Sequence, residues 1–309
     1  MERPKIAVIG SCNTDMVIKV DHLPKPGETI IGHDFMTNQG GKGANQAVAV
    51  ARMGGDTLFV ARLGDDGFGH QSLAMLEEEG VDTRFVRLTT GVSTGVAMIP
   101  VDEKGENSII VASGANAMLS ETDVEAAREE ICGSSILLMQ LETPIPTLMY
   151  AARMAHEAGV TVVLNPAPFP KEALPEDFLK NIDIITPNET EASGMSGIEI
   201  ADEASALRAI TAIRKLGVGK VVITAGGAGA YTEENGELQH IEAFKSHVVD
   251  TTAAGDTFCG ALCVALSQGK TLVQAISDAN RAASISVTRM GAWCSIPRAN
   301  EISEKWKVK

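Results

Sequence analysis

The sequence predicts an α/β fold, in which a doubly wound, mostly parallel sheet is flanked by helices and carries a small antiparallel β lid. Two observations predict it. Short apolar runs alternate with amphipathic stretches along nearly the whole chain, which is typical of strands joined by crossover helices. The 309 residues are 44% hydrophobic but only 4% aromatic, a composition that can bury a large layered core of small aliphatic side chains. We expect a single domain over residues 1–309.

The strands expected in the main sheet are continuous apolar runs. Such runs indicate that helices cover both faces of the sheet, since a half-exposed strand would alternate apolar and polar residues. In chain order, the expected strands are residues 5–10, 57–63, 135–141, 160–164, 182–186 and 220–224. The expected helices lie near residues 43–53, 68–79, 120–131, 146–158, 201–216, 255–268 and 271–288, and several of them end at glycine.

Segments 16–20, 29–36, 94–101 and 107–112 have strand patterns without intervening helices. We assign them to the lid, a small antiparallel sheet inserted at approximately residues 16–36 and 94–112. Such a sheet could close over a ligand or pair with a second subunit. A plain extension of the main sheet's edge is the alternative.

Charge and cysteine content exclude several classes of protein. With 26 basic and 40 acidic residues, the net charge of −14 opposes binding to nucleic acid or to an anionic membrane. No apolar stretch approaches the roughly 18 residues that suggest a membrane span. We expect a cytoplasmic protein that binds small molecules. The five cysteines lack the spacing of a zinc site or a disulfide framework and are expected to be small buried hydrophobes: Cys12, Cys132, Cys259, Cys263 and Cys294.

The run DTTAAGDTF at residues 250–258 places a carboxylate at the start of an expected helix. Gly255 can bring its backbone close to a ligand, and the free N–H groups of a helix's first turn attract an anion such as a phosphate. Asp256 is expected to be ionised at pH 7 and able to accept a proton from a hydroxyl nucleophile. This combination suits a kinase that acts on an alcohol. The alternative is an ordinary N-capping aspartate.

A second glycine cluster, NQGGKGANQA at residues 38–47, leads into the first long helix. It is not a Walker A loop, because Gly43 stands where that loop needs Ser or Thr. The first strand is followed by GSCNTD at 10–15 and not by a dinucleotide-binding GxGxxG. Lys42 and Asn45 remain, near a first strand that we expect to end in Asn13 and Asp15. Amide and carboxylate together suit hydroxyl binding, although either alone is more often a turn or capping residue.

These two signatures, with four blocks between them, resemble the ribokinase family of sugar and nucleoside kinases. The blocks are QLE at 140–142, NPAP at 165–168, TPNETE at 186–191 and TAGGAG at 224–229. The resemblance extends from the first strand to about Pro297. It implies a ribokinase-like fold and ATP-dependent phosphorylation of D-ribose at O5, yielding ribose 5-phosphate.

The resemblance also implies which residues form the site. Asp256 would be the general base, with the N–H groups of Ala254, Gly255 and Asp256 neutralising the charge that develops on the transferred phosphate. The implied sugar-binding residues are Asn13, Thr14, Asp15, Gly41, Lys42, Gly43, Ala44, Asn45, Glu142 and Asp256. The implied ATP-binding residues are Asn188, Thr224, Ala225, Gly226, Gly227, Ala228, Gly229, Gly255, Asp256 and Asn280.

The resemblance also implies two bound cations and a second subunit. Glu191 would hold Mg²⁺, or another divalent cation, through water. K⁺ would be bound mostly by backbone carbonyls at Asp250, Thr252, Ser286, Arg289, Gly291 and Ser295. The β lid would be the interface of a homodimer. From the residues alone, Asn188 could equally be a strand-end turn residue, and 224–229 could be a tight turn.

Three alternatives to a ribose kinase are open from the sequence. The chain could be a kinase of the same family that acts on deoxyribose, another sugar or a nucleoside, although the low aromatic content argues mildly against a nucleoside. It could be a catalytically silent sugar-binding or regulatory protein, against which the intact Gly255 and Asp256 argue. A dinucleotide-dependent oxidoreductase would need a fingerprint that the chain lacks.

Overall fold

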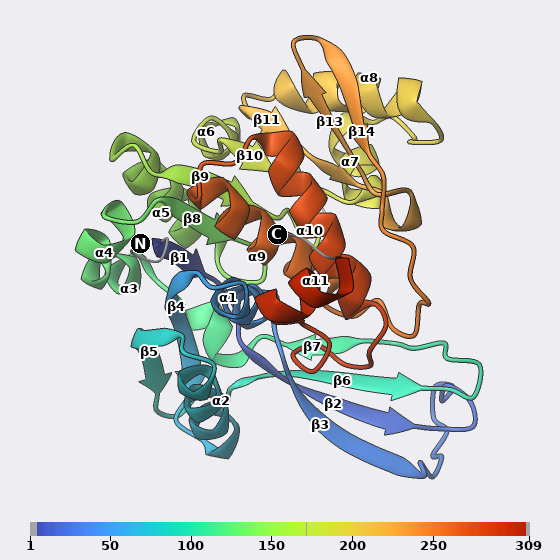
Figure 1. The fold of residues 1–309 in the computed structure, drawn as a ribbon. Coiled ribbons are helices and arrows are strands. Elements are labelled where there is room, and N and C mark those ends of the chain that lie inside the picture. Colours follow the sequence, from blue (N-terminus) through green and yellow to red (C-terminus); the bar gives the residue numbers. More distant parts are fainter. Residues whose placement is uncertain (1–4, 171, 307–309) are drawn as a thin grey trace.

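The computed structural model describes residues 5–170 and 172–306, which are arranged around a seven-stranded sheet of order β11-β10-β9-β8-β1-β4-β5 (Figure 1). Every pair of neighbouring strands in this sheet runs parallel. Its strands are β1 Lys5–Ile9, β4 Asp56–Gly64, β5 Asp82–Thr89, β8 Ile136–Met139, β9 Thr161–Leu164, β10 Ile184–Ile185 and β11 Lys220–Val221. The strand order reverses between β1 and β8, and ligands of doubly wound sheets bind at the carboxyl ends of the strands beside such a reversal.

Helices cover both faces of this sheet. Alternate residues of β1 enter two separate cores: Ile6 and Val8 pack in a core shared with α1, α9 and α10, and Ala7 and Ile9 in one shared with α5 and α8. This is the doubly wound arrangement that the continuous apolar runs predicted, and the predicted fold class is confirmed. The helices are α1 Lys42–Arg52, α2 Gly67–Glu78, α3 Glu121–Ala126, α4 Arg128–Cys132, α5 Ile145–Glu157, α6 Glu176–Leu179, α7 Glu189–Ser196, α8 Glu203–Arg214, α9 Ala254–Ser267, α10 Leu272–Ser286 and α11 Ala299–Trp306.

The predicted small sheet extends from the main body and has the order β3-β2-β6-β7 (Figure 1). Its strands are β2 Asn13–Lys19, β3 Asp34–Gly40, β6 Gly95–Val101 and β7 Ile110–Ala112. The outer pairs β2–β3 and β6–β7 are antiparallel, while the central pair β2–β6 is parallel. The two hairpins, far apart in the sequence, therefore meet side by side to build one surface, which we call the lid.

Several expected boundaries are wrong. The strand expected at 29–36 is β3, which continues to Gly40 because it pairs with β2 as far as Asn13. Asn13 and Asp15 consequently belong to β2 and not to the end of the first strand. The helix expected at 120–131 breaks at Ala127 into α3 and α4.

An additional sheet was not predicted from the sequence. The strand expected at 220–224 divides, since β11 ends at Val221 and β12 (Ile223–Thr224) joins β13 (Ala230–Glu234) and β14 (Glu237–Ile241) in a three-stranded antiparallel sheet. The edge strand β5 was missed as well, because its residues are half-exposed and lack a continuous apolar run.

The cysteines are all free thiols in the structure. Cys12, Cys259 and Cys263 are buried as expected, and burial raises the pKa of Cys12 and of Cys259 to about 12. Cys294 is exposed and Cys132 is half-buried, so the expectation of burial is wrong for these two. Among the described residues, no helix is both long enough and apolar enough to cross a membrane.

Candidate active site

The candidate site begins where the segment after β1 meets the first turn of α1. Gly41 has φ +85°, and an added Cβ there would lie 2.7 Å from the backbone nitrogen of Asn13. At Gly43 an added Cβ would lie 2.5 Å from the backbone nitrogen of Ser11. The Ala44 N–H donates to the Ser11 carbonyl at 2.8 Å. The glycine cluster thus allows the backbone of α1 to pack directly against residues 10–13.

Asp256 is the third residue of α9 and is only 6% exposed. Its Oδ2 accepts a hydrogen bond from Asn45 Nδ2 at 2.8 Å, and its Oδ1 accepts one from Gln46 Nε2 at 2.9 Å. The N-cap of α9 is Ala253, with φ +58° and no side-chain cap. Asp256 is therefore not the capping residue that the alternative interpretation proposed, and both of its oxygens face amide donors from α1.

Charged side chains surround this carboxylate. Glu142 Oε2 accepts a hydrogen bond from Ser11 Oγ at 2.5 Å and one from the backbone N–H of Lys42 at 2.9 Å. Burial, with the nearby carboxylates of Glu142 and Asp256, raises the pKa of Asp15 to about 7. Burial by itself would lower the pKa of Lys42, but the surrounding carboxylates, Asp256 first among them, raise it overall. The site thus combines an ammonium group with acids held close together.

One buried polar atom at this site has unused hydrogen-bonding capacity: Asn45 Oδ1 has no hydrogen-bond partner among the described residues. Thr14 Oγ1 is also buried and unpaired, but Thr14 alternates with Asn13 and Asp15 along β2 and therefore lies on the opposite face of the lid. Asn13 Oδ1 accepts from Asn116 Nδ2 at 2.7 Å, so Asn116, which the sequence analysis missed, fixes that side chain. Because an unpaired buried polar atom is costly, Asn45 Oδ1 suits a ligand that carries hydroxyl groups.

A cavity of about 690 Å³ lies on the other side of the α9 N-terminus. Eight of the residues predicted to bind ATP or to neutralise its charge line it: Asn188, Thr224, Gly226, Gly227, Gly229, Ala254, Gly255 and Asn280. Ala225, Ala228 and Asp256 do not line it. The Ala225 N–H donates to the Gly229 carbonyl at 2.8 Å, which closes the turn that presents the glycines.

The loop that forms one wall of this cavity was not predicted from the sequence. Phe244, Lys245, Ser246 and Val248 line it, and they follow β14 without any recognisable motif. Asn280 Nδ2 donates to the carbonyls of residues 241 and 242, at 3.0 and 3.2 Å, and so ties the start of this loop to α10.

Asn188 and Glu191 form the capping box of α7. Asn188 Oδ1 accepts from the Glu191 N–H, and Glu191 Oε2 accepts from the Asn188 N–H, both at 2.8 Å. Asn188 is therefore a helix cap as well as a cavity-lining residue. Burial raises the pKa of Glu191, and Asp256 adds to this effect, while the Asn188 N–H and Lys42 oppose it.

The six residues predicted to bind a monovalent cation come together from three segments. Asp250 accepts from the Thr252 N–H at 2.9 Å and from the Gly291 N–H at 2.8 Å. Although burial opposes it, hydrogen bonds from the Thr252 hydroxyl and then from these two N–H groups lower the pKa of Asp250, which favours its ionised form. Ser286 Oγ and Ser295 Oγ lie 3.1 Å apart. The Arg289 side chain pairs with Glu301, which leaves its backbone as the group available to an ion.

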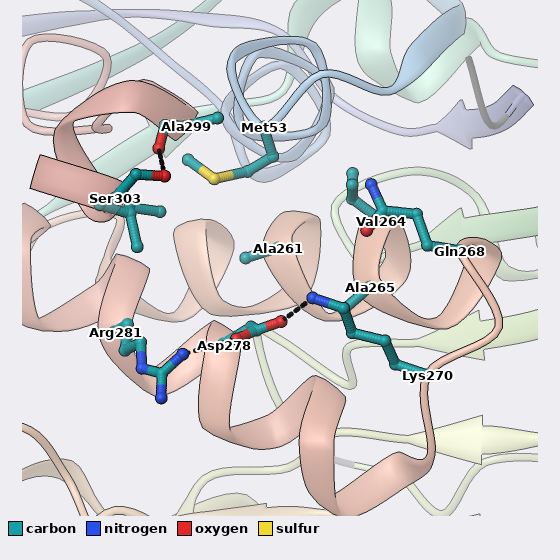
Figure 2. A pocket seen from close by; sticks show the side chains of 11 residues that line it. Met53, Ala261, Val264, Ala265, Gln268, Lys270, Asp278, Arg281, Ala299 and Ser303 are labelled. Atoms are coloured by element: carbon teal, nitrogen blue, oxygen red, sulfur yellow. Dashed lines mark hydrogen bonds and ion pairs between the residues drawn. The ribbon is translucent and has the colours of Figure 1, made fainter. Parts of the chain in front are cut away.

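A separate cavity of about 240 Å³ lies among α1, α9, α10 and α11 and contains none of the predicted site residues (Figure 2). Its charged side chains bind one another, since Asp278 accepts from Lys270 at 2.5 Å and from Arg281 at 3.1 Å. The chemistry predicted from the sequence is therefore concentrated around Asp256.

Residues 3–299 match the family model described as pfkB family carbohydrate kinase. The chain belongs to this family. It is 44% identical to a ribokinase of Haemophilus influenzae over 302 residues, which cover 98% of each chain. The predicted resemblance is confirmed.

Two further relatives bear on the substrate of this kinase. The structure of Arabidopsis thaliana ribokinase complexed with ribose and ATP matches it with a TM-score of 0.92 and 34% identity over the whole of both chains. A deoxyribokinase of Salmonella typhi is 33% identical over 97% of each chain.

Proposed function

We propose that this kinase transfers the γ-phosphoryl group of ATP to O5 of D-ribose, yielding ribose 5-phosphate. The observation that carries the proposal is the position of Asp256. Its carboxylate is bound by amides of α1 on the side of the hydroxyl-binding residues, while Gly255, its neighbour in the chain, lines the 690 Å³ cavity. Similarity to ribokinases over almost the entire length supports ribose as the sugar.

Asp256 acts as the general base. Its carboxylate accepts the proton of the O5 hydroxyl while that oxygen attacks the phosphorus in line with the leaving ADP. The N–H groups of Gly255 and Asp256 lie in the first turn of α9, where they have no partners within the helix, and they neutralise the charge on the transferring phosphoryl group. The Ala254 N–H, which donates to the Thr251 carbonyl at 3.2 Å, would join them only on leaving that acceptor.

The sugar binds among Asn13, Asp15, Lys42, Asn45 and Glu142. Carboxylates accept hydrogen bonds from sugar hydroxyls, and the ammonium of Lys42 donates to them. The unpaired Asn45 Oδ1 accepts from a further hydroxyl, while Nδ2 of the same residue holds Asp256. Asn45 would therefore link sugar binding to the position of the base.

Two cations complete the proposal. Glu191 fits a water-mediated contact to Mg²⁺, because it is an acid beside the nucleotide cavity, and Mg²⁺ keeps several of its waters. Bound Mg²⁺ would neutralise charge on the ATP phosphates. The oxygen-rich cluster around Asp250, Ser286 and Ser295, in which Ser295 Oγ also lies 3.5 Å from the Thr252 carbonyl, fits K⁺ held largely by carbonyls.

We further propose that the lid pairs with a second copy of this chain. Strand register places Ile18, Phe35, Met98 and Ile110 on one face of the lid, opposite to the face that carries Asn13 and Asp15. Phe35, Met98 and Ile110 are 64%, 57% and 66% exposed. Such an apolar face suits a protein interface. Light scattering at micromolar concentration should give a dimer mass, and a monomer mass would remove this proposal.

The activity is tested by measuring ATP consumption with D-ribose, 2-deoxyribose, fructose and adenosine, with Mg²⁺ and K⁺ present. We expect ribose to give the highest kcat/KM, and Asp256→Asn to lower kcat by about 10²- to 10⁴-fold, the usual contribution of a general base. ATP binding to the variant, followed by fluorescence titration, should be retained. A preference for another acceptor would replace ribose, and full activity of Asp256→Asn would remove Asp256 from its role.

A further inference from the structure

We propose that Gln46 is a positioning residue for phosphoryl transfer, which fixes the Asp256 carboxylate relative to the ends of the central strands. This inference rests on the proposed function, because it assigns Gln46 a role through the base of that reaction. Gln46 belongs to the glycine cluster NQGGKGANQA, but it is not among the residues implied to bind the sugar. It is fully buried, with 0% of its surface exposed.

All the hydrogen-bonding groups of the Gln46 amide bind other protein groups. Nε2 donates to Asp256 Oδ1 at 2.9 Å and to Asn165 Oδ1 at 3.2 Å. Oε1 accepts from Gln140 Nε2 at 2.6 Å. The carboxylate of Asp256 can only accept, so the nitrogen of Gln46 must face it, and the orientation of the amide is determined by its partners.

The partners of Gln46 connect it to three adjacent strands. Gln140 follows β8 directly, and Asn165 follows β9 directly. Asn165 Nδ2 in turn donates to the carbonyl of Thr186, the residue after β10, at 3.1 Å. The chain of amides therefore crosses the carboxyl ends of β8, β9 and β10 and ends on Asp256. Because these residues directly follow strands that are hydrogen-bonded on both sides, the contacts tie the carboxylate to the sheet.

Asn45 and Gln46 are adjacent but have different capacities. Asn45 holds Asp256 Oδ2 and keeps a buried acceptor without a partner, which a sugar hydroxyl can use. Gln46 holds Asp256 Oδ1 and has both its N–H donors and its carbonyl engaged by protein. Loss of Gln46 should therefore change kcat, through the base, far more than the KM of either substrate.

The first test is Gln46→Leu, which keeps the side-chain volume and removes the amide. We expect kcat to fall by at least about tenfold, since small misplacements of a reacting group are costly, with each KM changing less than about threefold. Thr147→Val is the matched control: it removes one buried hydrogen bond, from Thr147 Oγ1 to the Leu119 carbonyl at 2.9 Å, in α5, which packs on the face of the sheet opposite to α9. Its kcat should be native.

Two more variants, Gln140→Leu and the double variant Gln46→Leu with Gln140→Leu, distinguish a positioning role of Gln46 from a general loss of packing. If Gln140 acts only through Gln46, the double variant should be about as slow as Gln46→Leu, because interactions within one network are not additive. Independent, multiplying effects would overturn the proposal. Native kcat in Gln46→Leu, or a sugar KM that rises as much as kcat falls, would also overturn it.

Gln46→Glu supplies a pH readout of direct contact between position 46 and the Asp256 carboxylate, and it keeps the test decisive should the leucine variant fold poorly. The introduced carboxyl group and Asp256 would resist ionising together, so the acidic limb of the pH profile of kcat should move to higher pH by about one unit or more. A profile that superimposes on the native one would overturn the inference. No turnover in the native protein with any sugar would instead overturn the proposed function.

Discussion

Glycine occurs on both sides of Asp256, at Gly43 in the first turn of α1 and at Gly255 in the first turn of α9. At Gly43 an added Cβ would lie 2.5 Å from the Ser11 nitrogen and 2.6 Å from the Gly10 carbonyl carbon. At Gly255 an added Cβ would meet no atom within 4 Å. The protein's own packing therefore requires the first glycine, whereas the second leaves open space beside the nucleotide cavity. The same residue type, in the same position of two helices, has a structural role in one and a role in ligand binding in the other.

Gly43→Ala tests this difference most directly, and we expect it to have the largest effect, a loss of stability. The methyl group would collide with backbone atoms, which cannot rotate away as a side chain can. Overpacking of this kind costs about 1–3 kcal/mol, more than alanine gains over glycine within a helix. Urea unfolding should show a lower midpoint with an unchanged slope. A native midpoint would show that α1 can move away from residues 10–13 without cost.

Gly255→Ala should have the opposite effects: it should preserve stability and weaken ATP binding. Stability should be unchanged or higher by up to about 1 kcal/mol, because alanine favours the helix and meets nothing. The KM for ATP should rise by about tenfold, since the methyl group occupies space that a phosphate needs close to the backbone. The KM for the sugar measured in the same assays is the internal control. An unchanged KM for ATP would place the phosphates away from Gly255.

The sequence could predict the two signatures because each is continuous in the chain and lies at the start of a helix rich in small apolar residues. Helix α9 begins at Ala254, one residue from the predicted start at 255. The hairpin of β13 and β14 also had a signal that could have found it: Asn235 and Gly236, both with positive φ, form an Asn-Gly turn typical of hairpins.

Other parts of the site depend on contacts that no local pattern records. Loop residues Phe244 and Val248 reach the cavity beside Asn280, whose amide binds carbonyls at the start of that loop. Gln46 looks like any polar residue of a helix until the fold brings Gln140 and Asn165 to it. The different reasons for Gly43 and Gly255 are likewise visible only in three dimensions.

The smallest expected effect is a dependence of the KM for the sugar on pH, which concerns the sugar side of Asp256 and not the nucleotide side. Because burial and nearby carboxylates raise the pKa of Asp15 to about 7, this acid becomes ionised as the pH rises from 6 to 8. An ionised carboxylate binds sugar hydroxyls more strongly, so the KM for the sugar, measured at saturating MgATP, should fall by about threefold over this range. Asp15→Asn should raise that KM and abolish its pH dependence.

The same raised pKa makes a prediction about stability in the absence of sugar. Folding favours the protonated form of Asp15, so its contribution to stability is fully present below the ordinary pKa of an aspartate and is lost as the pH rises through about 7. Sugar should therefore raise Tm more at pH 8 than at pH 6, because it supplies hydrogen bonds to a carboxylate that is otherwise crowded by Glu142 and Asp256. Equal shifts in Tm at both pH values, together with a flat KM for the sugar, would mean that Asp15 is already ionised at pH 6 or does not contact the sugar.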